Sequence, residues 1–292
     1  MNKKKKIMAS VIMILALGLL VIFALGQKQE QPASGFAAHR VVAHAMGGIG
    51  GHTYTNAFEA FIANYEQGTR VFETDLLLST DNQLIARHEW TANMSKLLGQ
   101  TEVLSSDKVG APLSHDEFMN SPIMNIYSPL DLEKILDLMQ HYTDAYIVTD
   151  TKEFDSGLIM EQFEMLTEAA RTRDSALLER IVPQIYSRAM LDELNNIYMF
   201  PTVIYTLYNS KDTDAEVLEF VQNNKVDITM PASRASRDFV QKLKKAGARV
   251  YVHTVNEEDQ IVKLSRMGVD GFYTDFVAEN DLNRIKGLRS SL

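Results

Sequence analysis

Short runs of apolar and β-branched residues alternate with amphipathic stretches along almost the whole chain after residue 38. Such alternation is typical of a parallel α/β fold, in which each strand is followed by a helix that returns the chain to the sheet. The pattern predicts strands at 40–43, 71–76, 84–87, 145–149, 181–185, 202–206, 226–229, 249–252 and 271–273. It predicts helices at 55–67, 129–142, 158–173, 189–195, 214–223, 237–246 and 257–267.

One connection is too short to join two parallel strands. The apolar run of the second strand continues to residue 78, so only residues 79–83 lie between it and the third predicted strand, whereas a parallel crossover needs about a dozen residues. We therefore expect an antiparallel hairpin with its turn at 79–83, and the strand 84–87 is then an excursion from the end of the preceding one. Eight strands remain, which predicts a (β/α)₈ barrel of the TIM type.

Two further patterns concern the segments between strands. Residues 89–127 lack a strong hydrophobic period and are too long for an ordinary loop, so they are predicted as an insertion over the active-site face, with a lid as one role for it. Ser128, Pro129 and Asp131 predict a helix start with an N-cap, a proline at the first helical position and an acid in the first turn.

The N-terminal residues form a different kind of segment. Four consecutive lysines precede an uncharged run at 7–25, which would be roughly 28 Å long as a helix and would span the hydrocarbon core of a membrane. Residues 1–26 are predicted as a membrane anchor with a cytoplasmic N-terminus, or as a cleaved signal sequence. Residues 27–38 are predicted as a linker, and 39–292 as an extracytoplasmic domain that is membrane-bound, or secreted after cleavage.

The composition of the chain limits which bonds it can form and which partners it can bind. The chain has no cysteine, which excludes disulfides, thiolate metal sites and a lipid-modified N-terminal cysteine. Residues 1–38 hold five Lys and one Glu, so residues 39–292 carry a net charge of −13, against −9 for the whole chain. An acidic domain of this kind excludes nucleic acid as an expected partner and suits metal cations.

Carboxylates stand at the ends of two predicted strands, where the active site of such a barrel gathers. Glu73 and Asp75 share one side of their strand because side chains alternate, and Asp150 follows another strand. Three acids converging among apolar residues would repel one another, and a bound Ca²⁺ or Mg²⁺ would relieve that repulsion. Lys152 would face an anionic substrate. A solvent-facing strand, or a plain ion pair of Asp150 with Lys152, remains an alternative.

Histidines supply the expected acid–base chemistry. His44 and His88 both end predicted strands on the same rim, and two such imidazoles can act as general acid and general base. Trp90, Tyr205 and His253 are candidates for binding the substrate in the same pocket. For His253, a hydrogen-bonded structural role is the alternative.

The order of these residues from 41 to 275 resembles that of the glycerophosphodiester phosphodiesterases. The shared positions are His44, Asn56, Glu73, Asp75, His88, Asp150, Lys152, His253-Thr254-Val255-Asn256, Gly268-Val269-Asp270-Gly271 and Thr274-Asp275. The resemblance implies one divalent ion on Glu73, Asp75 and Asp150. It also implies that one of His44 and His88 deprotonates a substrate hydroxyl, which attacks phosphorus, while the other protonates the leaving oxygen. Water would then open a cyclic phosphate.

Several positions depart from the family pattern. Ala45 stands where the family usually has Arg, Thr55 replaces a Glu, and Glu89 replaces an Asp. Asp150 replaces a Glu, and the Asp150-x-Lys152 pair looks like the related sphingomyelinase D branch. The expected function is hydrolysis of a glycerophosphodiester or a related phospholipid headgroup. The alternatives are a phospholipase of type C or D acting on lyso- or sphingo-phospholipids, and an inactive barrel that binds an anionic surface polymer.

Overall fold

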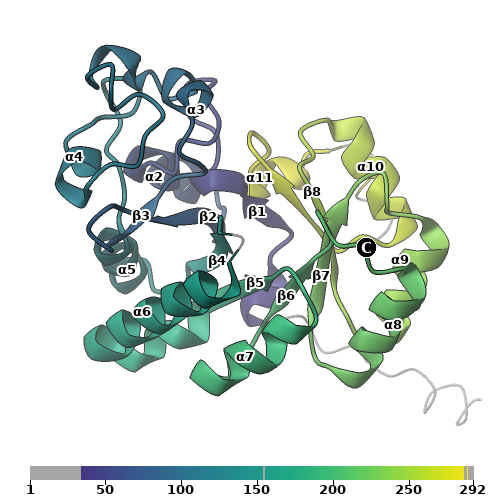
Figure 1. Cartoon of the computed structure of the whole chain (residues 1–292). Coiled ribbons are helices and arrows are strands. Elements are labelled where there is room, and N and C mark those ends of the chain that lie inside the picture. The colour runs from purple at the N-terminus through teal and green to yellow at the C-terminus, as the bar shows by residue number, and fades with distance from the viewer. Residues whose placement is uncertain (1–33, 154, 286–287, 289–292) are drawn as a thin grey trace, which may run out of the picture. The chain divides into compact units, whose positions relative to one another are not determined.

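Nine strands form the sheet of the unit His39–Leu292 in the computed structural model, which describes residues 34–153, 155–285 and 288 (Figure 1). Their bounds are β1 Val41–Ala43, β2 Val71–Leu78, β3 Leu84–Ala86, β4 Tyr146–Thr151, β5 Ile181–Ile185, β6 Ile204–Thr206, β7 Asp227–Pro231, β8 Val250–His253 and β9 Gly271–Thr274. All except β3 pair in parallel, and β1 closes the ring by pairing with both β2 and β9. The predicted (β/α)₈ barrel is confirmed.

The third strand leaves the barrel as expected. β3 pairs with β2 in an antiparallel register, with Leu76 opposite Ala86, and the turn is closed by the Ser79 amide donating to the Gln83 carbonyl at 2.9 Å. Asn82 supplies the left-handed backbone of the turn with a φ of 56°. The predicted hairpin is therefore confirmed, and pairing with β3 extends β2 two residues beyond its predicted end.

Helices surround the barrel strands. Their bounds are α2 Phe58–Glu66, α3 Ala92–Leu97, α4 His115–Met119, α5 Leu132–His141, α6 Ser156–Asp174, α7 Ala189–Ile197, α8 Asp214–Asn223, α9 Arg237–Lys245, α10 Glu258–Met267 and α11 Glu279–Leu282. In α9, for example, Phe239, Val240 and Leu243 are buried while the lysines of the last turn lie outside. The helix is held to the barrel by this apolar side, as its 3.6-residue period predicts.

The predicted start of α5 is wrong by three residues. Asp131 is the N-cap, and its side chain accepts a hydrogen bond from the Lys134 amide at 2.8 Å. Ser128 instead donates its amide and its hydroxyl to Glu59, at 2.7 and 2.8 Å, and Pro129 forms an isolated β-bridge outside the helix. The segment before the helix is extended, and its polar groups bond to neighbouring elements and not to the first turn of α5.

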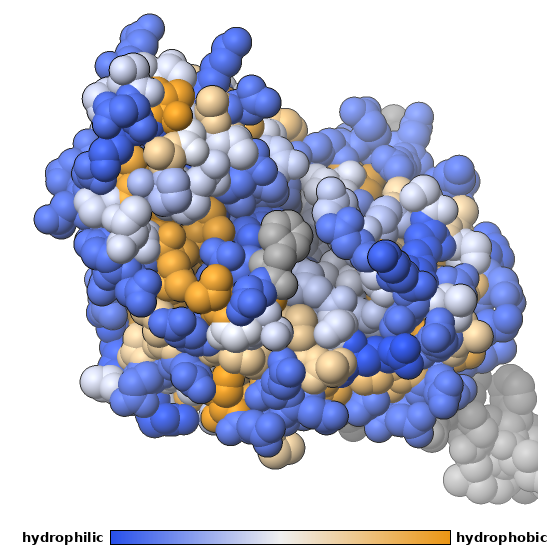
Figure 2. All heavy atoms as spheres, viewed as in Figure 1, coloured by the Kyte–Doolittle hydropathy of each residue, from blue (hydrophilic) through white to orange (hydrophobic). Residues whose placement is uncertain are grey.

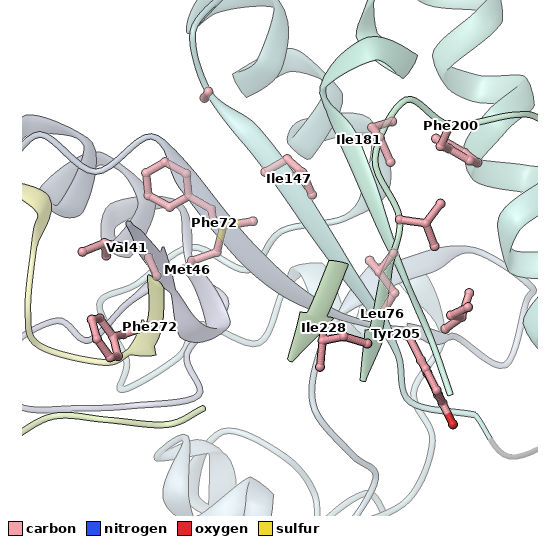
Figure 3. Packing of buried hydrophobic residues seen from close by; sticks show 14 of the residues in the cluster. Val41, Met46, Phe72, Leu76, Ile147, Ile181, Phe200, Tyr205, Ile228 and Phe272 are labelled. Atoms are coloured by element: carbon pink, nitrogen blue, oxygen red, sulfur yellow. The ribbon is translucent and has the colours of Figure 1, made fainter. Parts of the chain in front are cut away.

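Alternation along the strands separates two environments. Phe72, Thr74 and Leu76 of β2 face the surrounding helices, so Glu73 and Asp75 face the barrel interior. Figure 3 shows members of the outer core, among them Phe72 and Leu76 of β2 and Ile147 of β4. The two carboxylates are thereby carried inside by the same periodicity that builds the core.

The insertion at 89–127 has structure that its sequence does not predict. It contains α3, α4 and a 3₁₀ turn, and Ile85, Leu113 and Phe118 form a hydrophobic cluster separate from the main core. Figure 2 shows an apolar area of surface below the insertion, where β2 and β3 lie in Figure 1. The role of the insertion over the active-site face stays a prediction.

The predicted anchor at 1–26 and most of the linker at 27–38 lie outside the described residues. Within the described part of the chain, no helix combines the length and the apolar character needed to cross a membrane.

Candidate active site

The three predicted metal ligands come together at one end of the barrel. Asp75 of β2 and Asp150 of β4 are direct partners in the parallel register, and Glu73 lies two residues earlier on the same side of β2. One carboxylate oxygen from each residue lies within 4.8 Å of the others. The carboxylates are close enough to share a single cation.

Each carboxylate is oriented by a second contact on its own oxygen. The donors are the Ala45 amide to Glu73 Oε2 at 2.6 Å, the Asn56 side chain to Asp75 Oδ2 at 2.8 Å, and the Tyr186 hydroxyl to Asp150 Oδ1. Such outer contacts fix the direction in which ligand oxygens point. The other oxygens of Asp75 and Asp150 both face the Lys152 ammonium.

Charge in the cluster is only partly balanced by lysine. The Lys152 ammonium lies 3.0 Å from Asp75 Oδ1 and also pairs with Asp150. Burial, with the charge of Asp75, raises the pKa of Glu73 well above its usual range. Three carboxylates facing one ammonium fit a hard divalent cation with oxygen ligands, such as Ca²⁺ or Mg²⁺.

His44 lies at the carboxyl end of β1, next to these acids. Its Nδ1 is 2.9 Å from Asp275 Oδ1, and Asp275 in turn accepts a hydrogen bond from the Asn256 side chain at 2.8 Å. Burial alone would lower the pKa of His44. The hydrogen bond with Asp275 and the charges of Glu73 and Asp75 outweigh burial and raise that pKa to about 9. The carboxylates therefore stabilise a charged imidazole at this position.

His88 reaches the same site from β3. The Arg87 amide donates to the Asp75 carbonyl at 3.0 Å, which continues the hairpin and holds His88 beside the acids. Burial lowers the pKa of His88, and the opposing charge of Asp75 only partly offsets it. The ring of Tyr54 contacts both imidazoles, with centroid distances of 4.9 Å to His44 and 5.0 Å to His88. One imidazole that favours its charged form and one that favours its neutral form suit acid–base work.

The predicted substrate-binding residues are distributed unevenly. His253 lies on the inward side of β8, and its pKa is lowered to about 4 by burial and by the charge of His44, so it is neutral. The Tyr205 ring packs on the ring of Phe220 in α8, and its hydroxyl donates to Asp212 at 2.8 Å. The structure thus brings His253 and Lys152 to the acids but directs Tyr205 toward an outer helix.

Trp90 lies in the insertion, away from the barrel strands. Its ring packs edge-on against Phe118 at 6.3 Å, and the guanidinium of Arg87 lies 4.9 Å from its centroid. Arg87 is 1% exposed and donates to the Gln100 side chain at 2.7 Å, which ties the insertion to the end of β3. Contact of Trp90 or Tyr205 with a substrate stays a prediction.

Sequence reasoning gave no role to several residues that shape the site. Asp275 and Asn256 are polar residues at strand ends and belong to the positions shared with the family, but neither signal says that they orient His44. Tyr186 directly follows β5, so the rule applied to the other strands would have found it. Tyr54 lies in a loop three residues after Gly51, and nothing in a linear pattern places its ring against two histidines.

Solved structures share this fold. A glycerophosphodiester phosphodiesterase from Parabacteroides distasonis has 18% identity and a TM-score of 0.67, over 86% of this chain and 97% of the other. An enzyme of the same name from Thermotoga maritima has 20% identity and a TM-score of 0.62, over 84% and 96%. An Oleispira antarctica phosphodiesterase in complex with the product sn-glycerol-3-phosphate has 16% identity and a TM-score of 0.64, over 86% and 97%. Identities this low establish the fold alone.

The sequence itself decides the family. No curated protein sequence matches the chain. A model of the glycerophosphoryl diester phosphodiesterase family matches residues 47–279, a range that includes every predicted site residue except His44. The chain therefore belongs to the glycerophosphoryl diester phosphodiesterase family, and the prediction that it is a phosphoric diester hydrolase is confirmed.

Proposed function

We propose that the chain hydrolyses a glycerophosphodiester or a related phospholipid headgroup, with His44 and His88 as acid and base and one divalent ion on three carboxylates. One observation carries the proposal: both imidazoles contact the same tyrosine ring beside the cluster of Glu73, Asp75 and Asp150. Neither histidine is needed to hold the ion, so both are available for proton transfer.

The reaction divides between the two histidines. One imidazole takes the proton of a substrate hydroxyl, whose oxygen attacks phosphorus, and the other gives a proton to the oxygen of the departing alcohol as its bond to phosphorus breaks. Water then opens the cyclic phosphate with the proton transfers reversed, so that one diester and one water give a monoester and an alcohol. The divalent ion supplies charge stabilisation at the phosphoryl oxygens. Asp275 holds His44 in place through Nδ1.

Phosphorus NMR of the protein with a mixture of glycerophosphodiesters and lysolipids, with and without Mg²⁺ or Ca²⁺, tests the proposal. We expect glycerol 3-phosphate to form in an ion-dependent way and to be lost in the His44→Ala variant. Release of a phosphorylated headgroup, or of a cyclic phosphate from a lysolipid, would favour the phospholipase alternative, which the Asp150-x-Lys152 pair motivates. Unchanged spectra with every diester would refute the hydrolase.

We also infer that residues 1–26 hold the domain at the outer side of the cell membrane, or direct its secretion if they are cleaved. Support comes from the four lysines that precede the uncharged run at 7–25. Protease treatment of intact cells should degrade the domain, and N-terminal sequencing should distinguish anchor from signal. A domain protected from protease inside intact cells would contradict the proposal.

A further inference from the structure

Tyr54 occupies an unusual place in the site. It contacts His44 and His88 edge-on, at 81° to each imidazole. The two histidines come from different parts of the barrel, one from the end of β1 and the other from the excursion through β3. A single loop side chain therefore lies against both groups that exchange protons with the substrate.

The backbone conformation at Tyr54 indicates that its side chain has a functional role. Tyr54 has a φ of 58° and Asn56 a φ of 46°, both in the left-handed region. A non-glycine residue there costs roughly 1–2 kcal/mol, and glycine at 54 would relieve that cost. The loop is held by the Asn56 amide, which donates to the Ala45 carbonyl at 3.1 Å. Strained residues that persist in a rigid setting cluster at functional sites.

Most other donors at the site already have acceptors. Lys152 is committed to Asp75 and Asp150, and the side-chain amides of Asn56 and Asn256 donate to carboxylates. The residue beside His44 is Ala45, which offers no side-chain donor. The cations and amides of the site are thus engaged before any substrate enters.

The Tyr54 hydroxyl is different. Within the described residues it has no hydrogen-bond partner, and the side chain is half-buried, so a ligand can reach it. Thr55 also has an unpartnered hydroxyl, but that group is fully buried. Burial and the charges of Asp275 and Asp75 raise the pKa of Tyr54, which keeps the phenol protonated as a donor.

We propose that Tyr54 is a substrate-contacting residue whose hydroxyl donates a hydrogen bond to a phosphoryl oxygen of the diester held between His44 and His88. The inference rests on the proposed function, since it takes the substrate class from it. Its ring contacts both imidazoles edge-on, and its hydroxyl supplies a neutral donor where the lysine is already paired. The contact would act on the anionic oxygens and not on a transferred proton.

The test compares Tyr54→Phe, which keeps the ring, with the wild-type full chain. We expect sn-glycerol 3-phosphate to bind about 10- to 100-fold more weakly by calorimetry, as for the loss of one hydrogen bond to a charged group. The value of kcat/KM should fall over the same range. The limbs of the pH–rate profile should not move, because the phenol does not exchange a proton. The melting temperature should be unchanged.

Tyr198→Phe is the matched control, because Tyr198 is a surface tyrosine whose hydroxyl donates to Glu179 at 3.3 Å. It should leave binding and turnover unchanged. Equal affinity of wild type and Tyr54→Phe for sn-glycerol 3-phosphate would overturn the contact. A wild type that does not bind sn-glycerol 3-phosphate would overturn it as well. A wild type that binds glycerol 3-phosphate but hydrolyses no diester would refute the proposed function alone, and the calorimetric comparison would still decide the role of Tyr54.

Discussion

The two rims of the barrel use acidic side chains in different ways. At the N-terminal rim, Asp227 accepts the Arg249 amide and Asp270 accepts the Val250 amide, both at 2.9 Å. These two carboxylates stand at the starts of β7 and β9 and hold the backbone at the start of β8, the strand between them. At the C-terminal rim, the carboxylates converge within one cluster and are oriented by side chains and by a loop amide.

The difference teaches how a catalytic acid can be told from a structural one in this fold. A structural carboxylate completes its hydrogen bonds within its own neighbourhood, so little charge is left facing a ligand. The carboxylates of the C-terminal rim are crowded among apolar strands, and one lysine, Lys152, pairs with both Asp75 and Asp150. The site is marked less by acidic residues as such than by carboxylates that converge and whose charge is only partly balanced.

The largest effect should follow removal of the histidines. His44→Ala and His88→Ala should each lower turnover by about 10²–10⁴-fold, because a positioned proton-transfer group contributes that much. The double variant should be little worse than the poorer single variant, since the two act as a unit. Steady-state kinetics of the three proteins check this, with His141→Ala at the end of α5 as the control. Normal turnover by either single variant would contradict the mechanism.

Removing the converging carboxylates should come next. In Glu73→Gln/Asp75→Asn, calorimetry should detect no Ca²⁺ or Mg²⁺ binding, and turnover should fall on the order of 10²–10³-fold, as for the loss of charge stabilisation by an ion. A chelator should reproduce the loss in the wild type. Asp238→Asn, on the exposed side of α9, is the control. Undiminished ion affinity in the double variant would sink the site.

A smaller effect should follow when Asp275, the hydrogen-bond partner of His44, is replaced. Asp275 helps to raise the pKa of His44 to about 9, so the imidazole keeps its proton up to that pH. In Asp275→Asn this pKa should fall toward its ordinary value, and the activity limb owed to His44 should move to lower pH. We expect kcat/KM at neutral pH to drop about 10- to 100-fold because the ring also loses its anchor. A pH–rate profile with both limbs in place would count against this role.

The smallest effect belongs to the N-terminal rim. Burial raises the pKa of Asp227 from 3.8 to about 6, so the folded state holds this proton more tightly than the unfolded chain. Its contribution to stability is complete below about pH 4 and is lost as the pH rises through 6. The difference in the free energy of unfolding between Asp227→Asn and the wild type should therefore shift in favour of the variant between pH 4 and pH 7.5. The expected shift is on the order of 2 kcal/mol. Urea unfolding at both values measures this, and a pH-independent difference would contradict it.

How much the sequence predicts depends on whether a feature is local. The barrel and the hairpin follow from strand spacing and from one connection that is too short, both of which are linear properties. The carboxylate cluster follows in part because alternation puts Glu73 and Asp75 on one side. The N-cap of α5 was misplaced because Ser128 satisfies a glutamate distant in sequence. Tyr54 was missed because its position depends on left-handed backbone that a pattern of polar and apolar residues does not encode.

The insertion has a consequence for how such enzymes can change. The chain leaves the barrel after β3 and rejoins it where the Ala86 amide donates to the Leu130 carbonyl at 2.9 Å, so the two ends of the excursion meet. Leu113 and Phe118 of the segment pack with Ile85 of β3 in a cluster separate from the main core, so this part of it can be exchanged without reopening the ring of strands. Recombination at this junction would let a new surface be tried beside an unaltered pair of histidines.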